Sequence, residues 1–340
     1  MAEHFKTYYP WVKFPVVTNG PMAGVVGPEL ATEVTRAGGF GFLPAGRDLR
    51  QAEKNLQTCQ TLLSQLDIKL PEGQLPIGLG VLCFTVSQDA FIKLVKDYRP
   101  VAVWLFAPTN FKDYSTWADA VRAVSDAKIW VQSNSVADAV ELAKFADVLV
   151  MQGGDAGGHG GEKAASVISL VPEAVDAVGV PIIAAGGIAD GRGVAAAVAL
   201  GALGATMGTR FLACKEAEMS NAAYQKAILE AQDGGQTTFK HKVFDDMNAS
   251  GNVWPVTYDA RGLRNATSDS HDNGVSVEDN RKLFANAAKQ NGGFAGTIKE
   301  TRANAWAGTG VGLVRSVDAS YDIVTKSRND AIKILSGTKF

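Results

Sequence analysis

The chain has 340 residues, of which 46% are hydrophobic and 20% are charged, and its formal net charge is -2. This composition is typical of a globular protein with a large core, and the balanced charge argues against nucleic acid or an anionic membrane surface as a partner. Three scattered cysteines form neither a CxxC pattern nor a Cys/His cluster, so we expect no disulfide framework and no metal site. The sequence has no signal-peptide core and no run of about 20 apolar residues, which favours a cytoplasmic location.

Short apolar runs alternate with helix-like or glycine-rich segments in the first two thirds of the chain. We predict eight strands, at residues 14–19, 39–43, 75–82, 101–107, 128–133, 147–152, 181–187 and 205–212. The runs are continuously apolar, as in parallel strands that are buried on both faces. Residues 28–38, 135–145 and 191–201 are typical of the helices that connect such strands. The sequence therefore predicts an α/β fold, a (β/α)8 TIM barrel, with a doubly wound open sheet as the alternative.

The pattern changes after the eighth predicted strand. Two Ala-rich helical stretches flank a polar segment, residues 239–274, that has no clear periodicity. We interpret residues 215–320 as a mostly helical cap, inserted after a barrel that residues 1–214 form. Residues 321–340 are then expected to return to the barrel as a C-terminal helix.

Glycine-rich clusters follow the predicted strands. NGPMAG (residues 19–24) follows the first strand, QGGDAGGHGG (152–161) the sixth and AGGIADGRG (185–193) the seventh, and MGT (207–209) lies within the eighth. Because the site of a barrel lies at the C-terminal ends of its strands, we expect these clusters to converge on one face. The backbone N–H groups of AGGI and MGT, at neighbouring strand ends, predict a phosphate site, with simple tight turns as the alternative.

His159 is the one side chain in its glycine cluster that titrates near neutrality. The glycines lose much backbone entropy on folding, which indicates a loop moulded around a ligand, although a flexible surface loop is the alternative. His159 is accordingly a candidate catalytic base, or else a hydrogen-bonded histidine that fixes its own loop. Trp254 and Tyr258 are candidates for the mouth of the site, with an aromatic core as the alternative.

Several of these blocks carry a family resemblance. Residues 15–43, 150–161, 182–212 and 306–316 resemble the signature blocks of the nitronate monooxygenases, formerly called 2-nitropropane dioxygenases. The motif QGxxAGGHxG, which begins at Gln152, is shared with flavin-dependent enoyl-acyl-carrier-protein reductases and NADH:quinone reductases. The resemblance implies a barrel that binds FMN, which agrees with the phosphate site predicted from the glycines.

The resemblance also implies roles for single residues. His159 would be the catalytic histidine. The residues expected to bind FMN are Gly186, Gly187, Met207, Gly208 and Thr209 at the phosphate, and Pro21, Met22, Gln152 and Gly157 beside the isoalloxazine ring. Members of the family often have an asparagine that contacts the flavin after the third strand. This sequence has Gly80 there, so that contact is lost or supplied elsewhere.

The function that the resemblance implies is the FMN-dependent oxidation of alkyl nitronates by O2 to carbonyl compounds and nitrite, as in the detoxification of propionate 3-nitronate. Neutral nitroalkanes would also react if His159 is an effective base. One alternative is an NAD(P)H-dependent flavin reductase that acts on enoyl thioesters or quinones, and another is a barrel that binds a phosphorylated ligand without catalysis. The expected partners are a small nitronate and O2, not nucleic acid or a membrane. Whether the chain forms a homodimer stays open.

Overall fold

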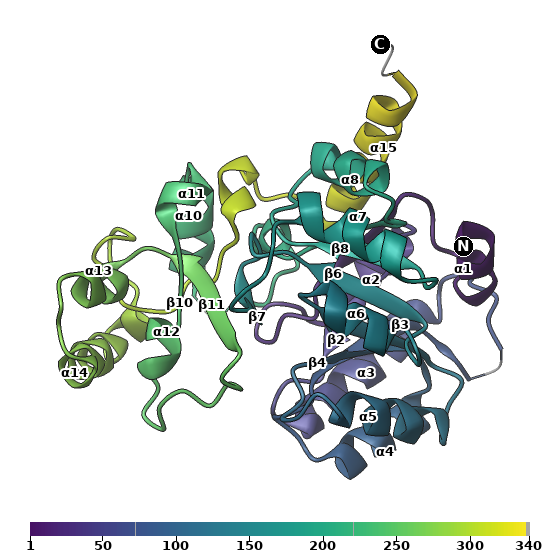
Figure 1. Ribbon diagram of the computed structural model, residues 1–340, viewed down its shortest axis with the longest axis horizontal. Helices are drawn as coiled ribbons and strands as arrows, with labels where there is room; N and C mark the ends of the chain where they lie inside the picture. The colour runs from purple at the N-terminus through teal and green to yellow at the C-terminus, as the bar shows by residue number, and fades with distance from the viewer. Residues whose placement is uncertain (72, 220, 338–340) are drawn as a thin grey trace.

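A computed structural model describes residues 1–71, 73–219 and 221–337 (Figure 1). Eight parallel strands form one sheet in the order β1-β9-β8-β6-β5-β4-β3-β2. Their bounds are β1 (Val16–Asn19), β2 (Phe42–Pro44), β3 (Leu75–Leu82), β4 (Pro100–Phe106), β5 (Lys128–Ser133), β6 (Val148–Gln152), β8 (Ile182–Ala185) and β9 (Gly204–Met207). A parallel bridge between Thr18 and Phe40 joins β1 to the segment before β2, so the sheet is nearly closed. The predicted barrel is confirmed, and the open sheet is excluded.

Helices connect the strands and cover the outside of the barrel (Figure 1). They are α2 (Pro28–Arg36), α3 (Leu49–Leu63), α4 (Gln88–Tyr98), α5 (Asp113–Arg122), α6 (Val136–Leu142), α7 (Val167–Ala177) and α8 (Gly191–Ala199). Their buried faces pack on the outward side chains of the strands, such as Val17, Leu79 and Val103, to form the larger of the apolar clusters. This layer gives the barrel a rigid wall.

Two predicted strands are shorter than expected. The seventh ends at Ala185, because Gly186 and Gly187 have φ angles of 106° and 73°, which break the extended conformation. The eighth ends at Met207, and Thr209–Leu212 forms the short helix α9. The prediction of a strand over residues 205–212 is therefore wrong in its second half.

Large aromatic side chains fill the N-terminal end of the barrel. Phe40, Phe42, Trp104 and Trp130 point inward and are buried with ring centroids 4.7 to 6.1 Å apart. Helix α1 (Ala2–Tyr8) covers this end, since the Nζ of Lys128, the first residue of β5, lies 3.9 Å from the Tyr8 ring centroid. We call this the closed end of the barrel.

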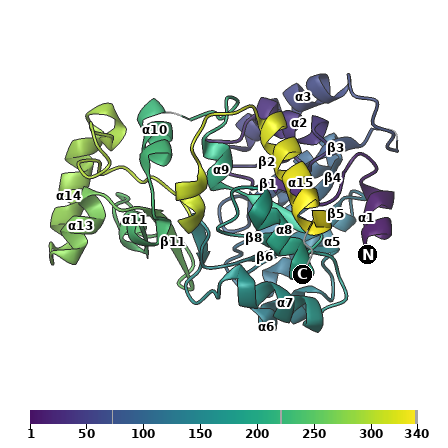
Figure 2. The ribbon, with the colours of Figure 1, turned by 90° about the horizontal axis from the view of Figure 1, so that it is seen from above.

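The chain after α9 forms a separate lobe beside the barrel and then returns (Figures 1 and 2). Its elements are α10 (Ala222–Glu230), α11 (Gly234–Thr237), β10 (Thr238–His241), α12 (Val243–Asp246), β11 (Tyr258–Leu263), α13 (Ala266–Asp272), α14 (Val277–Ala288), η1 (Asn291–Gly293) and η2 (Thr309–Leu313). Helix α15 (Ser320–Gly337) packs against α8, α2 and β1, and its C-terminal end projects from the body (Figure 1).

The polar segment 239–274 contains two strands that its sequence did not reveal. β10 pairs with β11, and β11 pairs antiparallel with β7 (Gly158–Gly161), which belongs to the glycine cluster after β6. The sheet therefore joins the cap to the barrel. We keep the division at residues 214 and 320 as a proposal, and residues 338–340 of the last predicted segment lie outside the described residues.

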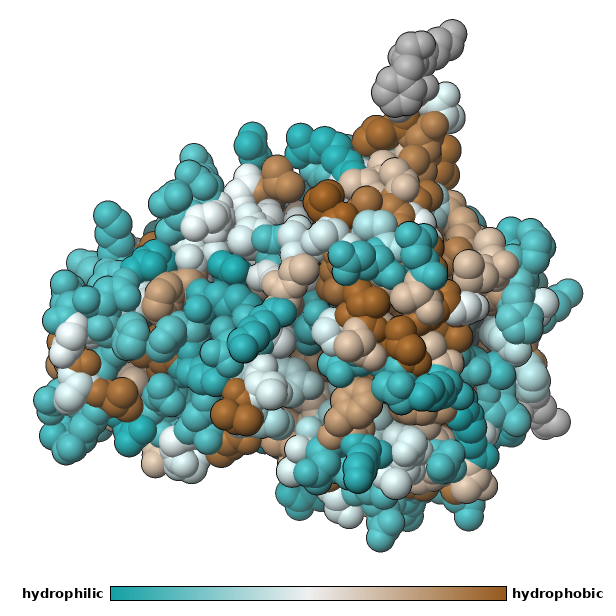
Figure 3. All heavy atoms as spheres, viewed as in Figure 1, coloured by the Kyte–Doolittle hydropathy of each residue, from teal (hydrophilic) through white to brown (hydrophobic). Residues whose placement is uncertain are grey.

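The surface in Figure 3 is mostly hydrophilic over the cap, while apolar side chains gather over α7, α8 and α15. Ile168 on α7 and Ile332 on α15 are among the exposed apolar side chains. In the described part of the chain, every helix is too short or too polar to cross a membrane.

Candidate active site

A cavity of about 520 Å³ lies at the C-terminal ends of the barrel strands, and Trp104 of the aromatic cluster is among the residues that line it. Its wall is formed by residues within β2, β3, β4 and β5 and by segments that follow β1, β6, β8 and β9, together with residues of the cap. The volume is within the range of small-molecule and cofactor sites. We call this the open end of the barrel.

Nearly all the site residues predicted from sequence line this cavity. They are Pro21, Met22, Gln152, Gly157, His159, Gly186, Gly187, Gly208 and Thr209. Met207 does not line it, because its side chain is fully buried in the layer between strands and helices. Its neighbour Thr206 lines the cavity instead, as the alternation of side chains along a strand requires.

The glycines after β8 and β9 form a polar cradle at one side of the cavity. Gly186 and Gly187 have left-handed φ angles, which side chains rarely adopt. Within residues 1–71, 73–219 and 221–337, the backbone N–H groups of Gly186, Gly187 and Gly208 have no hydrogen-bond acceptor. The hydroxyl of Thr209 accepts a 2.9 Å bond from the backbone N–H of Gly308 and holds the late glycine block against the cradle. Such free N–H groups suit an anion.

Gly80, where the resemblance leads one to expect an asparagine, has no room for a side chain. A Cβ on Gly80 would lie 2.5 Å from both Cβ and Cγ of Pro21, so the ring of Pro21 fills the space that a side chain would need. A polar group reaches the cavity from β5 instead. Gln132 lines it, and its Oε1 accepts a 3.2 Å bond from Nε1 of Trp104. The sequence analysis missed Gln132, although a polar residue at the end of an apolar strand is a recognisable signal.

The imidazole of His159 is held by side chains of the cap. It lies in β7, opposite Ala260 of β11, and its side chain is 13% exposed. Nε2 lies 2.8 Å from Oδ1 of Asp245 on α12. The indole of Trp254 stacks on the imidazole at a centroid distance of 3.7 Å and an interplanar angle of 9°, and Trp306 lies 5.0 Å away. Trp254 lines the cavity, as predicted for a mouth residue, whereas Tyr258 does not.

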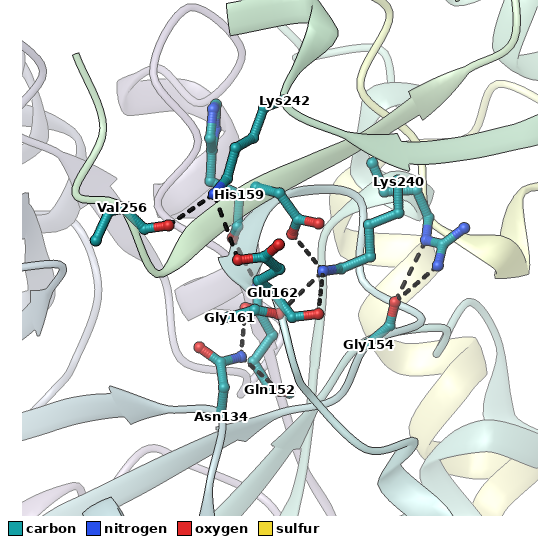
Figure 4. Close-up of polar contacts among 11 residues, drawn as sticks. Asn134, Gln152, Gly154, His159, Gly161, Glu162, Lys240, Lys242 and Val256 are labelled. Carbon is teal, nitrogen blue, oxygen red and sulfur yellow. Dashed lines mark hydrogen bonds and ion pairs between the residues drawn. The ribbon is translucent and has the colours of Figure 1, made fainter. Parts of the chain in front are cut away.

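Cations of the cap bind the backbone of the glycine loop (Figure 4). Nζ of Lys240 donates to the carbonyl oxygens of Gly161 and Glu162 at 3.0 and 3.3 Å and pairs with Asp259. Arg261 donates to the carbonyl oxygen of Gly154 at 3.0 and 3.3 Å, and burial lowers its pKa. These bonds hold the loop on the cap sheet. The interpretation as a flexible surface loop is therefore wrong.

The barrel side of the loop is fixed by amide side chains (Figure 4). Nδ2 of Asn134 donates to the backbone oxygen and Oε1 of Gln152 at 2.7 and 3.0 Å. Nε2 of Gln152 in turn donates to the backbone oxygen of His159 at 3.4 Å. The position of His159 thus depends on both the barrel and the cap.

Comparison with known proteins decides the family. The model of the nitronate monooxygenase family matches residues 92–326. The chain belongs to the nitronate monooxygenase family. It is 39% identical over 338 residues to nitronate monooxygenase npaC of Metarhizium robertsii, a match that covers 96% of this chain and 94% of the relative. It is 36% identical to a nitronate monooxygenase of Neurospora crassa, with 96% and 91% covered.

Solved structures show the same fold. FabK from Thermotoga maritima has a TM-score of 0.75 at 23% identity, covering 98% of this chain and 97% of that one. Nitroalkane oxidase from Streptomyces ansochromogenes has a TM-score of 0.75 at 21% identity, covering 98% and 99%. As a nitronate monooxygenase family member, the chain is an oxidoreductase, and members of this family are flavoenzymes.

Proposed function

We propose that the chain, loaded with FMN, uses O2 to oxidise alkyl nitronates, and also nitroalkanes, to carbonyl compounds and nitrite. The observation that carries the proposal is the placement of His159, which lines a glycine-walled cavity while its ring is held by Asp245 and Trp254. Propionate 3-nitronate is a natural substrate to expect, and its oxidation would serve detoxification.

The cavity suits FMN in volume and in chemistry. The free N–H groups at Gly186, Gly187 and Gly208, with the Thr209 hydroxyl, would hold the phosphate. Pro21 and Met22, with the Gln152 side chain and the Gly157 backbone, would border the ring system. When bound, the flavin supplies the electron transfer, while the protein supplies orientation and electrostatics.

The chain's own residues perform the proton transfer. In a nitroalkane, the imidazole of His159 takes the proton from the carbon next to the nitro group, and the C–H electron pair moves onto the nitro oxygens. A nitronate has already lost that proton, so His159 acts on it only by hydrogen bonding. Trp254 stacks on one face of the imidazole and Trp306 lies beside it, so the two indoles restrict the orientation of the ring.

The substitution His159→Asn tests this assignment. We expect kcat/KM for neutral nitroethane to fall about 100-fold, the usual contribution of a general base. The kcat/KM for preformed ethyl nitronate should fall by less than about tenfold, since only a hydrogen bond changes. The measurement is nitrite release in air with both substrates, and His4→Asn, at the closed end, is the matched control.

An equal loss on both substrates would assign His159 to binding and overturn its role as a base. Rapid bleaching of the flavin by NAD(P)H without O2, combined with no nitrite from either substrate, would favour the reductase instead. Protein that takes up no FMN would favour a barrel that only binds a phosphorylated ligand.

A further inference from the structure

Asp245 is a buried acid whose carboxylate contacts the predicted base. Its residue is 3% exposed, and Oδ1 lies 2.8 Å from Nε2 of His159, across 86 residues of chain. An ionised carboxylate only accepts hydrogen bonds, so Nε2 must carry the hydrogen in this contact. Nδ1 then keeps its lone pair. In the described part of the chain, Nδ1 has no hydrogen-bond partner, and His159 lines the cavity.

The carboxylate is rigidly placed by the packing of α12. Val243, Phe244 and Met247 are buried in a small apolar cluster of the cap. Nδ2 of Asn304 donates to the backbone oxygen of Phe244 at 3.3 Å, and Nδ2 of Asn248 donates to that of Asp245 at 2.9 Å. Because α12 is fixed at both its apolar and its polar side, Asp245 determines the orientation of the imidazole rather than following it.

Two features of this contact suit a base that becomes positively charged when it takes a proton from the substrate. Oδ2 of Asp245 is buried and has no hydrogen-bond partner among the described residues. A buried carboxylate that lacks hydrogen bonds is stabilised by a positive charge beside it. The indole face of Trp254, stacked at 3.7 Å, also attracts a cation. Both groups therefore stabilise the charge that His159 acquires when it takes a proton.

The other charged groups around β7 are engaged elsewhere. On β10 and β11, Lys240 pairs with Asp259, and Arg261 binds the backbone of Gly154. Lys242 pairs with Glu162 at 3.3 Å and donates to a backbone oxygen. In the described residues, Asp245 is the charged side chain that contacts the His159 ring.

We propose that Asp245 is a positioning residue that holds His159 as the Nε2–H tautomer, so that Nδ1 is the atom that receives the substrate proton. The catalytic half of this inference rests on the proposed function of His159, whereas the tautomer is a property of the resting protein. The two halves therefore have separate tests.

The first test is the tautomer itself, read by long-range 1H–15N NMR of FMN-loaded protein labelled with 15N-histidine. His159→Gln identifies the signals of His159 among the four histidines. We expect neutral His159 to carry its hydrogen on Nε2, and Asp245→Asn to abolish this preference, because an amide can donate to Nε2. A hydrogen on Nδ1 in the unmutated protein, or no change in Asp245→Asn, would overturn the proposal. This result does not depend on any activity.

The second test is kinetic and compares Asp245→Asn with Asp246→Asn, which removes the neighbouring charge of the same helix. For Asp245→Asn we expect kcat/KM for nitroethane to fall about 100-fold, and the midpoint of its pH–rate profile to move to lower pH. Oxidation of ethyl nitronate should stay within about threefold. Asp246→Asn should leave both substrates unchanged.

Equal losses on both substrates, or the same loss in Asp246→Asn, would show that Asp245 is merely structural. Absence of nitrite from both substrates with the unmutated protein would instead refute the proposed function and leave the NMR result to decide the tautomer. Asp245→Glu should recover part of the nitroethane activity, since a carboxylate is restored.

Discussion

The two ends of the barrel are built from the same strands and differ in what fills them. At the closed end, Trp130 packs with phenylalanine rings into an aromatic core, and Trp104, which stacks on Trp130, extends from this core to the wall of the cavity. At the open end, the positions after the strands are glycines or small residues, and a cavity of about 520 Å³ remains. Large side chains thus fill the end of the barrel that provides rigidity, whereas glycines and small residues at the other end leave room for a ligand.

The polar groups of the two ends differ in the same way. At the closed end, Nε1 of Trp130 donates to the hydroxyl of Tyr9 at 2.9 Å, so the buried polar pair is satisfied internally. At the open end, N–H groups of Gly186 and Gly187 are left free of acceptors in the described chain. The paired polar groups at the closed end contribute to stability, whereas the unpaired N–H groups at the open end can donate hydrogen bonds to a ligand.

The largest effect is expected from Trp130→Ala at the closed end. Trp130 is fully buried among aromatic rings, so the cavity left behind should lower the free energy of unfolding by about 3–5 kcal/mol. Urea denaturation measures this loss. Flavin binding at low temperature should persist, because Trp130 itself does not line the cavity. Loss of flavin affinity in protein that is still folded would contradict the separation of the two ends.

Gly187→Ala should act at the open end instead. Its φ of 73° is unfavourable for alanine by about 1–2 kcal/mol, and the new Cβ would lie 3.0 Å from Cβ of Asp155. We expect FMN to bind about tenfold or more weakly, as measured by fluorescence titration. Gly179→Ala is the control, because its Cβ meets nothing within 4 Å. Unchanged FMN affinity in Gly187→Ala would show that Gly187 does not contribute to FMN binding.

The smallest effect concerns alkaline pH. Burial raises the pKa of Tyr9, so above about pH 10 the unfolded chain releases a proton that the folded chain keeps. The unfolded state then binds fewer protons, and stability falls as pH rises, by at most about 1.4 kcal/mol per pH unit for this group.

Between pH 8.5 and 10.5, the free energy of unfolding measured by urea denaturation should therefore decline less steeply for Tyr9→Phe than for the unmutated protein. The free energy of unfolding of Tyr9→Phe should also be lower at every pH, because the hydrogen bond to Trp130 is lost. Tyr8→Phe is the control, because the hydroxyl of Tyr8 contacts His4 at an exposed position. Identical slopes in all three proteins would contradict the account of the closed end.

The barrel and its glycine-lined end could be predicted from sequence because both follow from local patterns. Continuous apolar runs gave the parallel strands, and strand ends of a barrel meet on one face. The role of Met207 at the phosphate stays a prediction about its backbone, because its side chain is buried and the alternation along the strand directs Thr206 to the cavity.

The cap sheet could not be predicted in the same way. β7 has the sequence GHGG, which carries no strand signal, and it is extended because it pairs with β11. Asp245 and Trp254 reach His159 from distant positions, and a contact across 86 residues has no local pattern. The chemistry of the imidazole thus depends on tertiary packing that the strand pattern does not contain.

The most direct test of the central claim is nitrite release from propionate 3-nitronate by the FMN-loaded protein in air, without NAD(P)H. The account predicts rapid nitrite formation with matching consumption of O2, because it assigns both flavin binding and His159 to the open end. A protein that retains FMN, yet forms no nitrite from this or a simple alkyl nitronate, would contradict it.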